Sequence, residues 1–211
     1  MENRSWIAAY RVVFVVMALA AIGYQFWYLA DRGGFRPANF FSFFTIQSNL
    51  FAAAVLLYGA VRDRDAERTL RHELIRGAAV LYMATTGVVY GLLLSGYQEE
   101  LQTTVPWVDT VLHKVIPLVL VADWLIDPPR VAIPFRRALI WLVYPMAYCA
   151  YSLIRGPIVD WYPYPFLNPD ETGGYLGVAL YTLGIAAGVL LFAWLVVQIG
   201  RRVRLAWDWA T

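Results

Sequence analysis

Two apolar stretches of this chain carry the polar side chains that are best suited to chemistry. They are Ser42, Thr45, Ser48 and Asn49 within residues 40–61, and Asp109, His113 and Lys114 within residues 108–126. Polar groups are costly inside a membrane span and usually face the protein interior. On a helix, the polar residues of the first stretch form one stripe, and Asp109 and His113 share a face.

Thr45, His113 and Asp109 have the side chains of an activated nucleophile. A neutral imidazole can take the proton of a nearby hydroxyl, and a carboxylate one turn away can orient that imidazole. Both stretches run inward from the outer rim, which places Thr45 and His113 at depths of about 8 and 9 Å. The sequence therefore predicts that the two can meet, with Thr45 as nucleophile, His113 as base and Asp109 as its orienting partner.

Three further residues are candidates for contacting a substrate. Asn49 lies one turn below Thr45 and is the first candidate for stabilising an oxyanion, and Ser48 is the second. Lys114 points about 100° away from His113, so it either extends to the outer surface, which we favour, or donates to a substrate anion. A purely structural interpretation stays open, because membrane threonines often bond the carbonyl one turn back and a buried histidine can bridge two helices.

The composition is that of a membrane protein. Of 211 residues, 60% are hydrophobic and 15% are charged, whereas an ordinary soluble domain carries roughly 25% charged residues. A helix needs ~20 apolar residues to cross a bilayer core. The stretches that qualify are 12–29, 40–61, 77–96, 108–126, 138–154 and 175–199. We therefore predict an all-α polytopic membrane protein, a single domain in which six transmembrane helices form one bundle.

The basic residues predict the orientation of this bundle. Of the 17 Lys and Arg residues, those on one side of the predicted spans are Arg4, Arg11, Arg62, Arg64, Arg68, Arg71, Arg76, Arg130, Arg136, Arg137, Arg201, Arg202 and Arg204. The positive-inside rule places this side, and with it both termini, in the cytoplasm. The stretch 12–29 ends in bulky aromatic residues, so we interpret it as a span rather than a signal peptide. Because the basic residues are spread between apolar stretches, no nucleic-acid partner is expected.

Several chemistries are not expected because their residues are missing. The chain has 2 His, too few for a histidine box that binds a metal. Cys149 is the only cysteine, which excludes an internal disulfide. Gly-x-Ser-x-Gly motifs, phosphate-binding glycine loops and nucleotide fingerprints are also missing. We therefore expect neither a metal nor a cofactor.

Prolines mark two places where the backbone should be unusual. Pro117 has no N–H for the carbonyl of His113, so the helix should be locally opened at this histidine. The segment 161–167, with the sequence WYPYPFL, is aromatic and rich in proline. It is expected to form an ordered cap or reentrant turn on the outer side. Near the cytoplasmic end of the predicted span 108–126, Asp123 should cap the helix or pair with Arg130 or Arg136.

Three segments of the chain resemble a known family. They are residues 40–50 (FFSFFTIQSNL), the His113-Lys114-x-x-Pro117 segment with Asp123-Trp124, and residues 162–166 (YPYPF). They look like bacterial six-span "Pr-six-Pr" membrane proteins, which are distantly similar to the eukaryotic androgen-induced membrane proteins, including the androgen-dependent TFPI-regulating protein. The resemblance covers most of the chain. It implies a multi-pass protein of the bacterial plasma (inner) membrane.

The same resemblance implies a hydrolase. The eukaryotic relatives cleave fatty acid esters of hydroxy fatty acids with a threonine nucleophile and an essential histidine inside the membrane. By motif, these two residues correspond to Thr45 and His113. The chain departs from the eukaryotic pattern at Asp109, where that pattern has asparagine, and at Pro117, which comes one residue sooner.

The resulting hypothesis is an integral-membrane lipid esterase that hydrolyses fatty-acyl esters entering sideways from the outer leaflet. Its expected partners are membrane lipids and the acyl-ester substrate, and its oligomeric state stays open. The alternative is a non-enzymatic small transporter or lipid-binding scaffold in which the same polar stripe lines a cavity. Transport is disfavoured, because the polar groups lie high in two spans rather than at the midplane of two symmetric halves.

Overall fold

The computed structural model describes residues 5–62 and 67–208, which form helices and no strands. The long helices are α1 (Ser5–Asp31), α3 (Phe44–Val61), α4 (Leu70–Val89, continued by a π-helix, Tyr90–Leu94), α8 (Val143–Val159) and α10 (Tyr175–Asp208). The shorter ones are α2 (Pro37–Phe40), α5 (Pro106–Thr110), α6 (Ile116–Ile126), α7 (Phe135–Ala138) and α9 (Pro169–Thr172). A π-helix (Val111–Val115) joins α5 to α6, a 3₁₀-helix (Leu139–Leu142) joins α7 to α8, and a second 3₁₀-helix covers Pro165–Leu167.

Five helical segments of the described chain are long and apolar enough to cross a membrane. They are Ser5–Asp31, Phe44–Val61, Leu70–Leu94, Phe135–Val159 and Tyr175–Ala206. The remaining predicted span, 108–126, is also helical, but it consists of α5, the π-helix and α6 and carries Asp109, Lys114 and Asp123. The all-α class is confirmed, and the helices are those of a multi-pass membrane protein.

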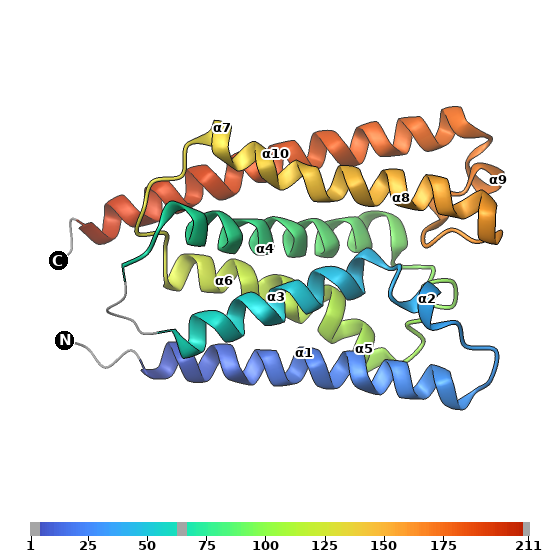
Figure 1. Ribbon diagram of the computed structural model, residues 1–211, viewed down its shortest axis with the longest axis horizontal. Helices are drawn as coiled ribbons and strands as arrows, with labels where there is room; N and C mark the ends of the chain where they lie inside the picture. The colour runs from blue at the N-terminus through green and yellow to red at the C-terminus, as the bar shows by residue number, and fades with distance from the viewer. Residues whose placement is uncertain (1–4, 63–66, 209–211) are drawn as a thin grey trace.

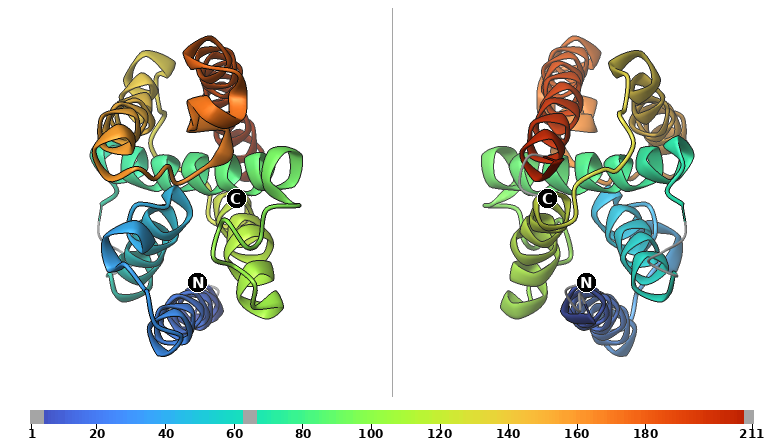
Figure 2. Two further views of the ribbon diagram at one scale, coloured as in Figure 1. Left: turned by 90° about the vertical axis from the view of Figure 1, so that its right-hand side faces the viewer. Right: turned by 90° about the vertical axis from the view of Figure 1, so that its left-hand side faces the viewer.

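Helix α4 lies in the middle of the bundle. It packs against α3 and α6 on one side and against α10 on the other, while α1 packs on α3. Figure 2 shows α8 and α10 as two arms above α4, with α1, α3 and α5–α6 below it. In Figure 1, the N-terminal end of α1 and the C-terminal end of α10 lie at the same end of the bundle. The opposite end carries α2, α9 and the segment between α8 and α10.

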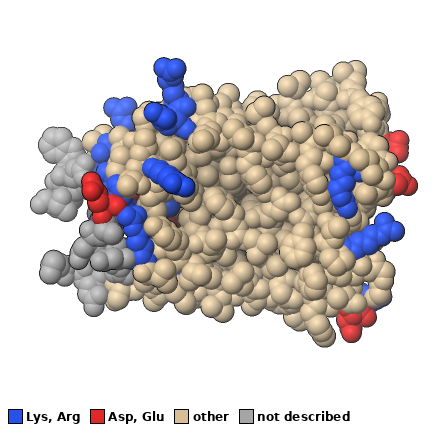
Figure 3. Space-filling view, in the orientation of Figure 1, with Lys and Arg blue, Asp and Glu red and all other residues tan. Residues whose placement is uncertain are grey.

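On the face drawn in Figure 3, the surface charges lie at the two ends of the molecule. Figure 3 shows Lys, Arg, Asp and Glu side chains near each end and a broad band without charge between them. Many large apolar side chains are exposed, such as Leu92 and Leu176, with 77% and 74% of their surface accessible. Such a band is suited to contact with lipid rather than water. Arg4 and Arg64, which were counted on the basic side, lie outside the described residues.

The predicted span 40–61 is interrupted near its start. Phe43 has an extended backbone (φ −71°, ψ 129°), so α3 begins only at Phe44. The hydroxyl of Ser42 therefore leaves the polar stripe, donates to the carbonyl of Ala38 at 2.6 Å and contacts the hydroxyl of Tyr151 at 2.8 Å. Placing Ser42 on the same helix face as Thr45 was wrong, because the short helix α2 ends before it. The interruption puts Thr45 in the first turn of α3.

A buried ion cluster stabilises the end of the bundle at which α1 begins and α10 ends (Figure 1). It consists of Arg11, Arg68, Arg76, Glu73, Asp123 and Asp127. Asp123 accepts from Arg11 at 2.6 Å and from Arg76 at 3.0 Å. The expected pairing with Arg130 or Arg136 was wrong, because the arginines that reach Asp123 come from distant helices rather than from the next loop. Burial alone would raise the pKa of Asp127, but Arg76, Arg68 and Arg11 hold it well below its usual range.

Removing one cation from this cluster is expected to destabilise the protein strongly. Arg76→Met leaves Asp123 and Asp127 short of a buried partner, which costs about 3–5 kcal/mol of unfolding free energy. Arg71→Met is the matched control, because Arg71 is exposed on the same helix and its loss should change stability by no more than about 0.5 kcal/mol. Thermal unfolding in detergent measures both. Equal midpoints for the two variants would contradict the assigned role of the cluster.

Candidate active site

The structure brings Thr45, His113 and Asp109 into one chain of hydrogen bonds. The hydroxyl oxygen of Thr45 lies 3.2 Å from Nε2 of His113, and Nδ1 of His113 lies 3.0 Å from Oδ1 of Asp109. All three are buried, with 6%, 3% and 7% of their surface exposed. A carboxylate only accepts hydrogen bonds, so we assign the ring proton to Nδ1. Nε2 is then free to accept the proton of Thr45.

A π-helix places His113 at this point. Within Val111–Val115 the backbone hydrogen bonds join residues five apart instead of four, as between the N–H of Ile116 and the carbonyl of Val111. Pro117 follows and has no N–H. The sequence predicted a free carbonyl at His113, but the five-residue spacing of the π-helix makes Leu112 the residue whose carbonyl loses its partner. The carbonyl of Leu112 is instead satisfied by the side-chain amide of Asn49, at 3.2 Å. Insertions of this kind are frequent at functional sites.

Gly87 allows α4 to lie close to the opened helix. A Cβ at Gly87 would stand 3.1 Å from the Cβ of Pro117 and 3.4 Å from the carbonyl oxygen of His113. A larger residue here would push the two helices apart. The local opening is therefore enclosed between α3, which supplies Asn49, and α4, which supplies this glycine.

Tyr90 is a site residue that the sequence did not reveal. Its ring stacks on the ring of His113, with 4.0 Å between centroids and an angle of 11°. Its hydroxyl donates to Oδ2 of Asp109 at 2.6 Å. Tyr90 therefore fixes both the plane of the imidazole and the position of the carboxylate that orients it. The sequence alone would suggest that a tyrosine in an apolar span only packs. The one available signal was that Tyr90 lies three residues after Gly87, on the side of α4 that contacts the helix of His113.

Tyr164 covers Thr45 from the other side. It belongs to the segment 161–167, which is ordered and lies over the start of α3, where Phe43 packs edge-on against Trp161 and Tyr164. The N–H of Thr45 donates to the hydroxyl of Tyr164 at 3.2 Å, and the two hydroxyls are 3.4 Å apart. Burial raises the pKa of Tyr164, which keeps its phenol protonated. The Tyr164 phenol therefore lies next to the Thr45 hydroxyl and has a proton with which it can donate a hydrogen bond there.

The predicted oxyanion donors act differently in the structure. Asn49 donates to the carbonyls of Thr45 and Leu112, at 2.8 and 3.2 Å, so both of its N–H groups are used. Ser48 bonds the carbonyl of Thr45 at 3.2 Å and the hydroxyl of Thr86 at 3.1 Å. Assigning them to the oxyanion was a misreading, since both brace the backbone behind Thr45. Lys114 has an exposed side chain and is not brought to the site.

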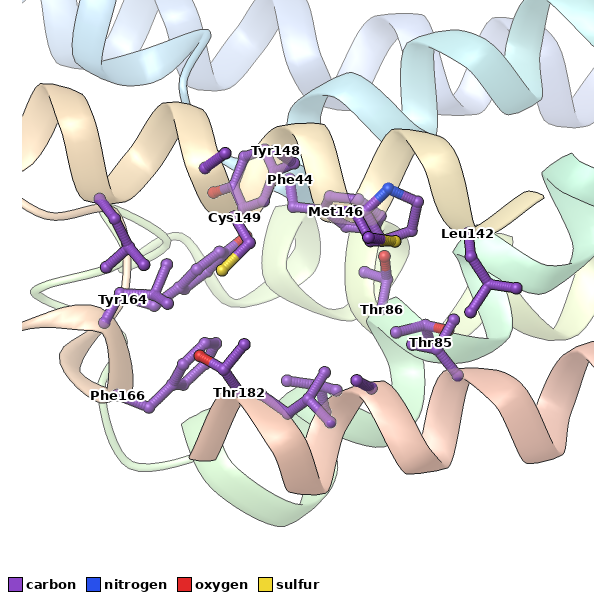
Figure 4. A pocket seen from close by; sticks show the side chains of 18 residues that line it. Phe44, Thr85, Thr86, Leu142, Met146, Tyr148, Cys149, Tyr164, Phe166 and Thr182 are labelled. Carbon is purple, nitrogen blue, oxygen red and sulfur yellow. The ribbon is translucent and has the colours of Figure 1, made fainter. Parts of the chain in front are cut away.

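An apolar groove lies beside this site. It has a volume of about 450 Å³ and is bounded by α4, α8 and α10, with almost wholly apolar walls. Figure 4 shows Tyr164 and Phe166 at one end and Leu142 and Thr85 at the other. The groove was not predicted, because its walls come from three helices and a loop whose proximity is a property of the folded bundle.

Comparison with known protein families, characterised proteins and solved structures gives no match to this chain. Among residues 5–62 and 67–208, no three His, Cys, Asp or Glu side chains are grouped as metal ligands would be. The chemistry of the site therefore has to be argued from its own groups. They are a hydroxyl against an imidazole, a carboxylate behind the imidazole and a phenol in front of the hydroxyl.

Proposed function

We propose that this protein is an integral-membrane hydrolase that cleaves fatty-acyl esters. The observation that carries the proposal is the buried chain Thr45–His113–Asp109, with 3.2 and 3.0 Å between successive atoms. A hydroxyl, an imidazole and a carboxylate in this order form the arrangement that activates an oxygen nucleophile. The resemblance of the motifs around Thr45 and His113 to membrane threonine hydrolases supports the same reaction class.

The reaction follows from these positions. The Thr45 oxygen attacks the ester carbonyl while its proton passes to Nε2 of His113. The tetrahedral intermediate collapses, the bond to the alcohol oxygen breaks, and His113 returns the proton to the leaving alkoxide. Water then gives a proton to His113 and attacks the acyl-threonine, which releases the fatty acid and restores the hydroxyl. General acid–base help of this kind contributes about 10²- to 10⁴-fold in rate.

The proposal includes an orientation in the membrane. We propose six spans, with α5, the π-helix and α6 together forming the fourth, and with both termini in the cytoplasm of a bacterial inner membrane. The basic residues near the termini and the uncharged band between the two ends support this orientation (Figure 3). The site then lies close to the outer surface, where water has a short path to the acyl-enzyme.

We assign Tyr164 as the donor to the oxyanion. Tyr164→Phe removes its hydroxyl and should lower kcat by about 10²- to 10³-fold, the usual cost of one lost oxyanion donor. Tyr162→Phe is the control, because it removes a hydroxyl from the same segment without changing a contact of Thr45. Steady-state kinetics on an acyl ester measure both. A normal kcat for Tyr164→Phe would remove this residue from the mechanism.

The proposed function is tested by covalent labelling. The detergent-purified protein is treated with a fluorophosphonate probe, and the labelled peptide is identified by mass spectrometry, in the wild type and in His113→Ala. We expect labelling on Thr45 that disappears without His113. An intact, folded protein that takes up no label would instead favour a lipid-binding scaffold or transporter built on the same residues.

A further inference from the structure

We propose that the groove between α4, α8 and α10 holds the acyl chain of the ester, and that this chain enters from the lipid between α8 and α10. The inference rests on the proposed function and goes beyond it, because it names the half of the substrate that is recognised, the path that it takes and the residues that limit its length. Three features of the groove carry it, namely its closeness to Thr45 through Tyr164, its separation from His113 and its walls.

The groove comes within one side chain of Thr45, although Thr45 does not itself line it. Tyr164 lines the groove, and its hydroxyl lies 3.4 Å from that of Thr45. Phe44, the residue before Thr45, lines it as well. A carbonyl carbon bound next to the Thr45 oxygen therefore has one apolar space beside it into which its chain can extend.

The position of His113 decides which half of the ester occupies this space. The leaving alkoxide receives its proton from Nε2 of His113, so the alcohol half must lie on the side of Thr45 that faces the imidazole. Among the described residues, the groove is lined by Tyr164 but not by His113. Since the Tyr164 hydroxyl is directed at the carbonyl oxygen, the half on this side is the acyl half, which stays attached to Thr45 after the alcohol has left.

The walls and dimensions of the groove suit a hydrocarbon chain. Its volume of about 450 Å³ is within the range of ligand pockets, roughly 300–1,000 Å³. Along α8 it is lined from Leu142 to Leu153, a rise of about 16 Å. Met146 of α8 and Ala186 of α10 line it, and both are exposed. A chain can therefore enter from the lipid without passing through water.

This assignment predicts selectivity for acyl length. Each methylene that enters the groove should raise kcat/KM until the groove is filled, by less than the about fourfold expected for burial of one CH₂ from water, because the chain comes from lipid. Lengthening the alcohol half at a constant acyl group should have a much smaller effect. A series in which the alcohol, and not the acyl group, sets kcat/KM would overturn the assignment.

The protein offers a binding test that does not depend on hydrolysis. Cys149 is the only cysteine and lines the groove, so the rate of its alkylation by bromobimane reports whether the groove is occupied. We expect palmitate in detergent micelles to slow this alkylation severalfold and butyrate to leave it unchanged. Equal rates with palmitate and butyrate would overturn the proposal.

Two neighbouring alanines of α10 provide a matched pair of variants. Ala186 lines the groove and Ala187 does not, and both are exposed. Ala186→Phe should abolish protection of Cys149 by palmitate and shift hydrolysis towards short acyl esters, while Ala187→Phe should do neither. Protection that persists in Ala186→Phe would contradict the assignment.

The two proposals fail in different ways. Protection of Cys149 by palmitate without turnover of any ester would keep the groove as a chain-binding site and reject the esterase. Turnover of esters without protection, and without dependence on acyl length, would keep the esterase and reject the groove as its chain-binding site.

Discussion

Replacing Thr45 by valine is expected to abolish ester hydrolysis, with a loss of about 10⁶-fold in kcat, as for removal of the nucleophile from a hydrolytic triad. Valine has nearly the shape of threonine, so the buried packing at the start of α3 should persist. Thr45→Ser keeps a hydroxyl at hydrogen-bond distance from His113 and should retain measurable turnover. Hydrolysis of a long-chain acyl ester in detergent, together with the thermal unfolding midpoint, measures both variants.

Ser48→Ala provides the control for this pair. Ser48 lies one turn along the same helix and bonds Thr45 only through its backbone carbonyl, at 3.2 Å. Its loss should therefore alter turnover by a few-fold at most. If the valine variant hydrolyses the ester as well as the serine variant does, Thr45 is not the nucleophile.

Changing Asp109 to asparagine should have the second largest effect. The amide can donate to Nδ1 of His113, which favours the tautomer that carries its proton on Nε2. That tautomer cannot accept the proton of Thr45, and the equivalent change in a serine protease lowers kcat by about 10⁴-fold. We expect a similar loss here with little change in KM, measured by steady-state kinetics.

Tyr90→Phe distinguishes a change in the tautomer of His113 from the loss of one hydrogen bond to Asp109. The phenylalanine ring can still stack on His113, but the donor at 2.6 Å from Asp109 is lost. The carboxylate remains, so the expected loss is well below that of Asp109→Asn. An asparagine variant with wild-type kcat would show that the carboxylate does not set the tautomer of His113.

The similar depths of Thr45 and His113 could be predicted because depth depends on local quantities, whereas the contact between their helices could not. Depth along a helix follows from the rise per residue, and the shared face of Asp109 and His113 follows from a spacing of four. The opening at Pro117 was predictable for the same reason, since a missing N–H acts on its own helix. The structure agrees with these expectations because neighbouring helices leave them unchanged.

The rest of the site depends on contacts that no local pattern encodes. Tyr164 is 119 residues from Thr45, and Arg11 is 112 residues from Asp123. The role of Asn49 was misjudged, because its amide compensates for a carbonyl that the π-helix and Pro117 leave free on another segment. The periodicity of an apolar span says which face a residue occupies, but not which distant backbone group it meets.

The buried ion cluster also has a consequence for the order in which the protein is made. Arg11 is synthesised 112 residues before Asp123, an interval of about 6–22 s at 5–20 residues per second. An unpaired guanidinium is costly below the membrane surface. In the proposed orientation, the first turns of α1 should therefore stay at the cytoplasmic face until α6 has been inserted. Helix α1 is synthesised before α6 but would reach its final position only after it.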